Sequence, residues 1–168
     1  MLAGGQSRRF GSDKALALLN DRPLIDHALG ALAGCDAVAV AGREWPGVTA
    51  LPDRPVPDLG PLGGLNAALH HAAAQGFSHV ASLPVDCPAL PADWRTRLGE
   101  GPAHAAGQPL IGVWPTNLAA ALDDFVAGGG RRVRDWTAIA GARSADLGAL
   151  PNLNHRGDLI SLQNGSWG

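Results

Sequence analysis

The stretch MLAGGQSRRFGSDKALALL, residues 1–19, begins with apolar residues and continues as a glycine turn and a cationic loop. Gly4 and Gly5 let the backbone approach a ligand closely, because neither residue carries a Cβ atom. The loop matches neither G-x-x-x-x-G-K-S/T nor G-x-G-x-x-G, two common loops that bind nucleotide phosphates. It still predicts a turn of the βα type, with a short strand that ends at Ala3 and a ligand at the turn.

The cations of this stretch predict that the ligand carries phosphate. Arg8 or Arg9 can hold two phosphate oxygens at once, and Lys14 adds a mobile point charge. Backbone N–H groups of the glycine turn can line the same anion cavity. The simpler alternative is a glycine turn followed by a solvated basic stretch.

The composition indicates one folded domain, which we expect over residues 1–168. The chain is 46% hydrophobic and 17% charged, which argues against disorder. Its formal net charge of −2 gives no protein-wide basic field, so we expect no nucleic-acid partner. Cys35 and Cys87 form no C-x-x-C motif and fit a reducing cytoplasm. No apolar run has the length of a membrane span, so we expect no membrane partner.

Helix-like and strand-like segments alternate along the chain. The predicted helices cover residues 24–33, 62–75, 91–98, 117–127 and about 155–163, and the predicted strands cover 36–41, 79–83 and 109–114. This alternation predicts an α/β fold with a mostly parallel sheet and helices on both faces. In such a sheet, ligands bind beyond the carboxyl ends of the strands.

The strand that precedes the glycine turn is short. Only three residues come before Gly4, whereas a strand usually has five or six. We expect this strand either to be unusually short or to be truncated before Met1.

Two aspartates follow strand-like segments. Asp86 follows ASLPV between Pro84 and Pro88, and its carboxylate can supply one oxygen ligand to Mg²⁺. Asp53 follows VTALP and can bind a base or a ribose. The alternatives are a turn aspartate that caps the following backbone at Asp86 and an Asp-Arg-Pro turn at Asp53.

Glycines also mark the start of the helix near Leu62. Gly60, Gly63 and Gly64 permit a flat base to approach closely, and the first helical turn offers free N–H donors. The alternative is that these glycines bind no ligand and only allow the chain to enter the helix and small residues to pack closely.

The segment LAGGQSRRFGSDK at 2–14 resembles the signature L-A-G-G-x-S-x-R-M-G-x-D-K of the molybdenum cofactor guanylyltransferases. Phe10 replaces the methionine of that signature with another apolar residue. Further segments resemble motifs of the same family, namely NDRPL (20–24), GPLGGL (60–65), PVDCP (84–88), GRRV (130–133) and NLN (152–154). Because these motifs keep the family's order over most of the chain, the resemblance implies a three-layer Rossmann-like nucleotidyltransferase fold.

The resemblance assigns roles to residues at the matching positions. The implied nucleotide-binding residues are Leu2, Ala3, Gly4, Gly5, Lys14, Asp53, Gly63 and Asp86. The implied catalytic residues are Arg9, Lys14 and Asp86, with Asp86 as the Mg²⁺ ligand. The candidates for binding the second substrate are Asn152, Asn154, Arg131 and Arg132. The alternatives are that the two asparagines belong to a turn and that the two arginines form a solvated cationic face.

The implied activity is the transfer of GMP from GTP to the terminal phosphate of molybdopterin or its molybdenum form, with release of pyrophosphate. The partners are then GTP, the pterin and, as further candidates, other proteins of molybdenum cofactor biosynthesis. Three alternatives stay open: a cytidylyltransferase for the same pterin, a sugar-phosphate nucleotidyltransferase, and a nucleotide-binding module without catalysis. A defective fragment is a further possibility if the first strand is incomplete.

The chain departs from the family at three places. His155-Arg156-Gly157 replaces Thr-Pro-Glu after NLN, Gln108 replaces a histidine before Pro109, and Gly42 stands where the family has asparagine. These departures concern contacts with the second substrate more than nucleotide or metal binding.

Overall fold

The computed structural model describes residues 1–4, 13–153 and 155–163 of the 168-residue chain. Its helices are α1 (Leu24–Ala31), α2 (Pro61–Ala74), α3 (Trp94–Leu98), α4 (Ala119–Ala127), α5 (Val133–Ile139) and α6 (Arg156–Gln163). Two 3₁₀ turns are η1 (Lys14–Leu16) and η2 (Thr116–Leu118). The strands are β1 (Leu18–Leu19), β2 (Arg22–Pro23), β3 (Ala39–Ala41), β4 (Thr49–Leu51), β5 (His79–Ser82), β6 (Ala103–Ala105), β7 (Gln108–Pro115) and β8 (Arg143–Ala145).

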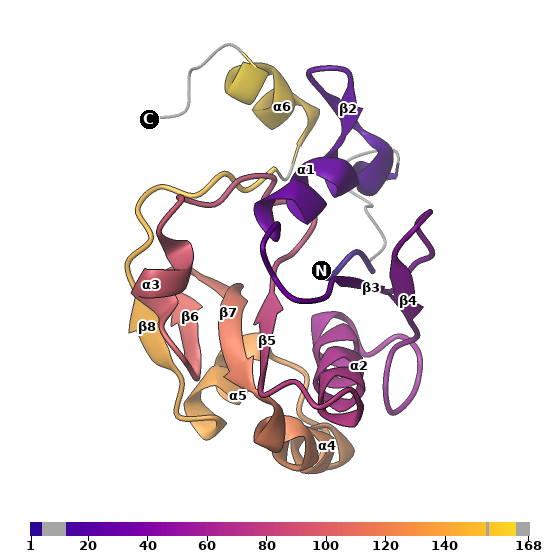
Figure 1. Cartoon of the computed structure of the whole chain (residues 1–168), viewed down its shortest axis with the longest axis vertical. Coiled ribbons are helices and arrows are strands. Elements are labelled where there is room, and N and C mark those ends of the chain that lie inside the picture. The colour runs from indigo at the N-terminus through magenta and orange to yellow at the C-terminus, as the bar shows by residue number, and fades with distance from the viewer. Residues whose placement is uncertain (5–12, 154, 164–168) are drawn as a thin grey trace.

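The first three residues join two groups of strands into one mixed sheet (Figure 1). Leu2 bridges Ala41 on one side and Pro84 on the other, both in parallel. The order across the sheet is therefore β4, β3, residues 1–3, β5, β7, β6 and β8. Strand β7 is antiparallel to β5 and to β6, whereas β6 is parallel to β8 and β3 is parallel to β4. All strands of this sheet except β7 thus share one direction, as the mostly parallel prediction requires.

Helices cover both faces of the sheet, and each face has its own apolar core. On one face, leucines of α2 pack with Trp114, Trp136 and the apolar side of α4. On the other face, α1 and α3 pack with Met1, Leu83 and Ile111. The α/β prediction with helices on both faces is confirmed.

Several element boundaries differ from the prediction. The short helix begins at Trp94 rather than at residue 91, and β3 begins at Ala39 rather than at residue 36. Helix α5 and strands β6 and β8 were not predicted, and neither was the hairpin of β1 and β2. Within the described residues, no helix combines the length and the apolar character needed to cross a membrane.

Candidate active site

Charged side chains gather where parallel strands end. Arg43 follows β3, Asp53 follows β4, and Asp86 lies four residues beyond β5. The end of the opening loop brings Lys14 to the same edge of the sheet, where it contacts Asp86. This is the edge at which α/β sheets bind ligands.

Lys14 and Asp86 form the central contact of this site. The Nζ atom of Lys14 lies 3.4 Å from the Oδ2 atom of Asp86, and their side chains are 14% and 27% exposed. The backbone carbonyl of Asp86 accepts a hydrogen bond of 3.0 Å from the N–H of Leu153. The carboxylate is thus held beside a cation yet keeps contact with solvent, so a phosphate group or a cation can reach it.

A second ion pair fixes the end of the opening loop. Both nitrogens Nη1 and Nη2 of Arg43 donate to the carboxylate of Asp13, and the Nη1 bond is 3.0 Å long. The same carboxylate caps η1 by accepting from the N–H of Ala15. The bond from Arg43 lowers the pKa of Asp13 below its ordinary value. Arg43 was not singled out from the sequence. The available signal was its place two residues beyond a strand, which Asp53 shares.

Gly42 explains one departure from the family pattern. It has φ +89°, and a Cβ atom at this position would overlap the Cα atom of Gly4 and lie 2.6 Å from its nitrogen. An asparagine does not fit this backbone unless the two segments separate. Glycine at 42 therefore permits the close approach of the opening turn to the end of β3.

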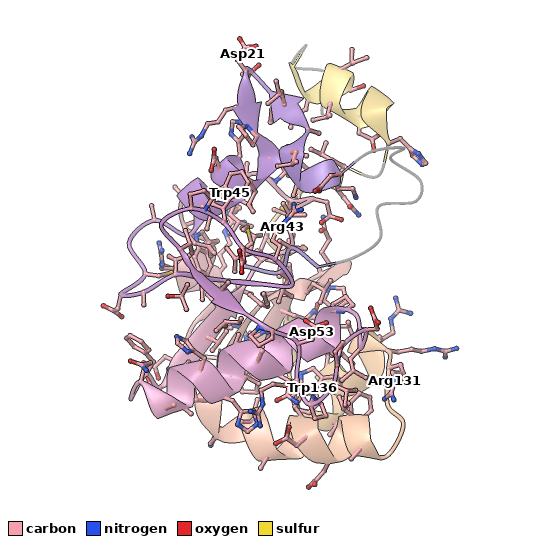
Figure 2. The ribbon with its side chains drawn as sticks, turned by 90° about the vertical axis from the view of Figure 1, so that its right-hand side faces the viewer. Asp21, Arg43, Trp45, Asp53, Arg131 and Trp136 are labelled. Carbon is pink, nitrogen blue, oxygen red and sulfur yellow. The ribbon has the colours of Figure 1, made fainter. Side chains whose placement is uncertain are left out.

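Asp53 lies beside the first turns of helix α2 (Figure 2). A Cβ atom on Gly63 would lie 3.0 Å from both Cβ and Cγ of Asp53. Burial, and then the neighbouring carboxylate of Asp58, raise the pKa of Asp53 above its ordinary value. Glycine at 63 thus lets a half-buried carboxyl group pack directly against the helix.

Gly64 sets the distance between helix α2 and the sheet. A Cβ atom at this position would lie 3.0 Å from the Cβ of Ala41 and 3.1 Å from the Cδ2 of Leu2. Leu2 itself is buried in a small cluster with Ala41 and Leu51. Its side chain therefore serves packing, and only its backbone and that of Ala3 face the ends of the neighbouring strands.

The candidates for the second substrate lie in different places. Asn152 is exposed and precedes Leu153, whose N–H contacts Asp86. Arg131 donates to the carbonyls of Val126 and Gly130, so its guanidinium caps the C-terminal end of α4 (Figure 2). Arg132 is exposed at the N-cap of α5. The remaining predicted residues, Gly5, Arg9 and Asn154, lie outside the described residues.

Known proteins resemble this chain over most of its length. Residues 1–144 match the MobA-like NTP transferase domain. The molybdenum cofactor guanylyltransferase of Acidiphilium cryptum is 37% identical, over 98% of this chain and 93% of that protein. The probable molybdenum cofactor guanylyltransferase of Deinococcus radiodurans is 42% identical, over 95% of this chain and 90% of that protein.

A solved structure shows the same fold. The molybdopterin-guanine dinucleotide biosynthesis protein A of Archaeoglobus fulgidus superimposes with a TM-score of 0.76 over 98% of this chain and 96% of that chain, at 16% identity. The family model covers most of the chain, and the relatives match nearly its full length. The chain belongs to the family of molybdenum cofactor guanylyltransferases, within the MobA-like NTP transferase domains.

Proposed function

We propose that this protein transfers GMP from GTP to the terminal phosphate of molybdopterin or its molybdenum form. The observation that carries the proposal is the contact between Lys14 and Asp86 at the carboxyl edge of the sheet. The guanine base and the pterin come from the names of the relatives. Two free cysteines, Cys35 and Cys87, support a reducing cytoplasm as the place of the reaction.

The proposed reaction requires positioning and charge neutralisation. An oxygen of the pterin phosphate attacks the α-phosphorus of GTP, a new P–O bond forms, and the bond to the β-phosphate oxygen breaks. The attacking phosphate is already anionic, so no general base is needed. In the proposed complex, Lys14 and Arg9 hold oxygens of the triphosphate and of the departing pyrophosphate.

The side chain of Asp86 suits a magnesium ion that is shared with the substrate. Among the described residues, no three His, Cys, Asp or Glu side chains group as a metal site. Mg²⁺ fits a single partly exposed carboxylate, because it keeps several waters and takes its other ligands from phosphates. Once bound there, Mg²⁺ supplies positive charge to the reacting phosphates.

The nucleoside part of GTP is proposed to lie between the opening turn and helix α2. Gly4 lies against Gly42, and Asp53 packs against Gly63, so glycine backbone and one carboxyl group border this side of the site. The pKa of Asp53 is raised by burial. A carboxyl group in this setting gains from a hydrogen-bond donor such as a ribose hydroxyl or a guanine N–H group.

The second substrate is proposed to lie on the side of Asp86 that faces Asn152. The bond from Leu153 to the carbonyl of Asp86 holds the segment of residues 151–153 there. Arg132, and Asn154 from outside the described residues, are kept as further candidates for the pterin phosphate. Arg131 is the weakest of the set, because its guanidinium already donates to two carbonyls.

The test is an Asp86→Asn variant, assayed for pyrophosphate release from GTP with molybdopterin and Mg²⁺. We expect a rate at least about 100-fold lower, because one charged ligand at the reacting phosphates is lost. The melting temperature should change little, since the side chain is 27% exposed. Asp93→Asn is the matched control, because Asp93 is an exposed carboxylate that pairs with Arg97 on α3. A near-normal rate of Asp86→Asn at ordinary Mg²⁺ contradicts the assignment.

A further inference from the structure

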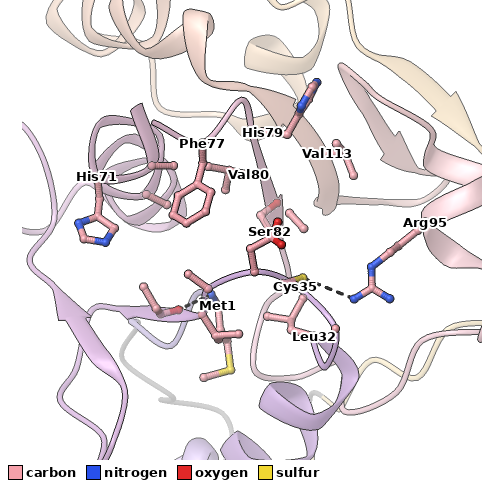
Figure 3. Close-up of a pocket in the computed structure, with 18 of the residues that line it drawn as sticks. Met1, Leu32, Cys35, His71, Phe77, His79, Val80, Ser82, Arg95 and Val113 are labelled. Atoms are coloured by element: carbon pink, nitrogen blue, oxygen red, sulfur yellow. Dashed lines mark hydrogen bonds between the residues drawn. The ribbon is translucent and has the colours of Figure 1, made fainter. Parts of the chain in front are cut away.

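Polar side chains that the proposed reaction does not use gather between helices α2 and α4. A cavity of about 450 Å³ beside Met1 lies on a different side of α2, and its lining is mostly apolar (Figure 3). His71 lines that cavity, whereas its neighbour His70 contacts Asp123 of α4. Consecutive residues of a helix point in different directions, so the contact between His70 and Asp123 is separate from the cavity.

Helix α2 holds both oxygens of the Asp123 carboxylate. The Nδ2 atom of Asn66 donates to Oδ1 over 2.7 Å, and the Nε2 atom of His70 donates to Oδ2 over 2.8 Å. An ionised carboxylate only accepts hydrogen bonds, so this nitrogen of His70 carries a proton. Asn66 and His70 are four residues apart on α2, which brings both donors to the same face of the helix. The carboxylate is therefore fixed beside α2.

Asn66 is at a position where an apolar residue would be expected. Its side chain is fully buried on α2, where leucines of the same helix pack against α4. Its Oδ1 atom has no hydrogen-bond partner among the described residues. An unpaired buried oxygen is costly, and an aliphatic side chain would avoid that cost. The amide of Asn66 thus serves the carboxylate of Asp123 rather than the packing of the core.

Arg54 is the cation of the neighbouring loop that interacts with Asp123. Burial alone would raise the pKa of Asp123, but the bonds from Asn66 and His70, with the charges of His70 and Arg54, lower it below its ordinary value. The carboxylate is therefore ionised at neutral pH and attracts the guanidinium of Arg54. The backbone N–H of Arg54 donates to the carbonyl of Gly63 over 3.2 Å, which ties this loop to the first turn of α2.

Asp53 directly precedes Arg54, and its carboxyl group is surrounded differently. Burial, and then the carboxylate of Asp58, raise the pKa of Asp53. The Cγ atom of Asp53 lies 3.0 Å from the place of a Cβ atom on Gly63, so the carboxyl group packs against α2. A guanidinium paired with Asp53 would lower that pKa and occupy the oxygens that accept from a ligand. A free Asp53 carboxyl group therefore requires that Arg54 points elsewhere.

We propose that Asp123 is a positioning residue, which draws the guanidinium of Arg54 toward α4 and thereby leaves the carboxyl group of Asp53 open to the nucleoside of GTP. Asn66 and His70 fix the carboxylate for this task. The role rests on the proposed function, in which Asp53 binds the nucleoside. Without the charge of Asp123, the guanidinium of Arg54 pairs with the adjacent carboxyl group of Asp53.

The experiment compares Asp123→Asn, Arg54→Ala and the double variant with the parent chain. Asparagine keeps the shape of aspartate without its charge, and the side chain of Asp123 is 37% exposed, so we expect the variant to fold. Asp124→Asn is the matched control, because Asp124 is an exposed carboxylate at the next position of α4. NMR titration measures the pKa of Asp53, and calorimetry with Mg²⁺ measures the affinity for GTP.

We expect Asp123→Asn to lower the pKa of Asp53 by about one pH unit and to weaken GTP binding about three- to tenfold. The Asp124→Asn control should leave both values unchanged. Adding Arg54→Ala to Asp123→Asn should restore both values, because the released cation is then absent. Lost packing between α2 and α4 would not be restored in this way.

An unchanged titration of Asp53 in Asp123→Asn overturns the proposal. A loss of GTP affinity that persists after Arg54→Ala is added also overturns it, because Asp123 then acts without Arg54. The titration of Asp53 needs no GTP. It therefore decides the proposal even if the parent chain binds no GTP, a result that would contradict the proposed function instead.

Discussion

Gly42 lies where the end of β3 meets the opening turn. The sequence marks this position as a departure from the family, and the structure supplies the reason. With φ +89° and the atoms of Gly4 against its open side, the residue has no room for a Cβ atom. The absence of the family's asparagine therefore follows from the close approach of two backbone segments, which no pattern within one segment reveals.

We expect Gly42→Asn to lower the free energy of unfolding by about 2 kcal/mol, because asparagine must displace Gly4. Gly47→Asn is the matched control, since Gly47 has φ +74° but has no atom within 4 Å of its added Cβ. Asparagine tolerates that backbone region, so the control should lose well under about 1 kcal/mol. Urea unfolding of the two variants measures the difference, and equal losses would refute the steric explanation.

Some residues of the candidate site could be predicted from the sequence, and others could not. Asp86 and Lys14 were predicted as site residues, and the structure brings them into contact. Arg43 was missed because an arginine in a loop is solvated by default, and only the fold brings it to Asp13. Gly63 was predicted to admit a base, and its geometry also supports the alternative of small-residue packing, since Asp53 lies against it.

At the scale of elements, the predicted helices and strands with clear periodicity were largely found. Helix α2, strand β7 and helix α4 lie close to the predicted ranges. Strands β6 and β8 have three residues each, too few for a pattern to emerge, and pairing with β7 and with each other forms them. Helix α5 follows GGGRR, a run that reads as loop, and it forms because Trp136 is buried against Trp114.

The link between the opening loop and β3 is the element-scale contact that bears on function. Arg43 holds Asp13, and Asp13 caps η1, which begins at Lys14. Arg43→Ala should therefore weaken GTP binding about three- to tenfold by releasing the loop, as titration calorimetry would measure. Arg22→Ala is the control, because Arg22 donates to a carbonyl of α1 instead. Unchanged affinity in Arg43→Ala contradicts this role.

The same variant has a defined dependence on pH. Arg43 lowers the pKa of Asp13 below the ordinary value of 3.8, so the pair stabilises the folded state above that pH. The stability difference between the parent and Arg43→Ala should be present at pH 7 and vanish as pH falls through the lowered pKa. It should stay below about 1 kcal/mol, because the two side chains are 24% and 41% exposed.

At the scale of the whole molecule, the alternation of segments predicted the layers, and the order of the strands came only from the structure. Residues 1–3 lie at the centre of the sheet, with β3 on one side and β5 on the other. That order is set by pairings between residues that are distant in the sequence. The hydrophobic pattern within one segment does not show which strand it pairs with. The same central position places Gly4 against Gly42, just beyond the end of β3.

The proposed guanylyl transfer is tested most directly by the rate of dinucleotide formation from molybdopterin, measured in the presence of Mg²⁺ with GTP, CTP, ATP or UTP in parallel. We expect GTP alone to support rapid turnover, with equal amounts of pyrophosphate and guanine dinucleotide released. Faster turnover with CTP would contradict the guanylyl assignment and leave the fold and the phosphate chemistry in place. Tight binding of GTP without pyrophosphate release, in a sample that unfolds cooperatively, would contradict catalysis itself.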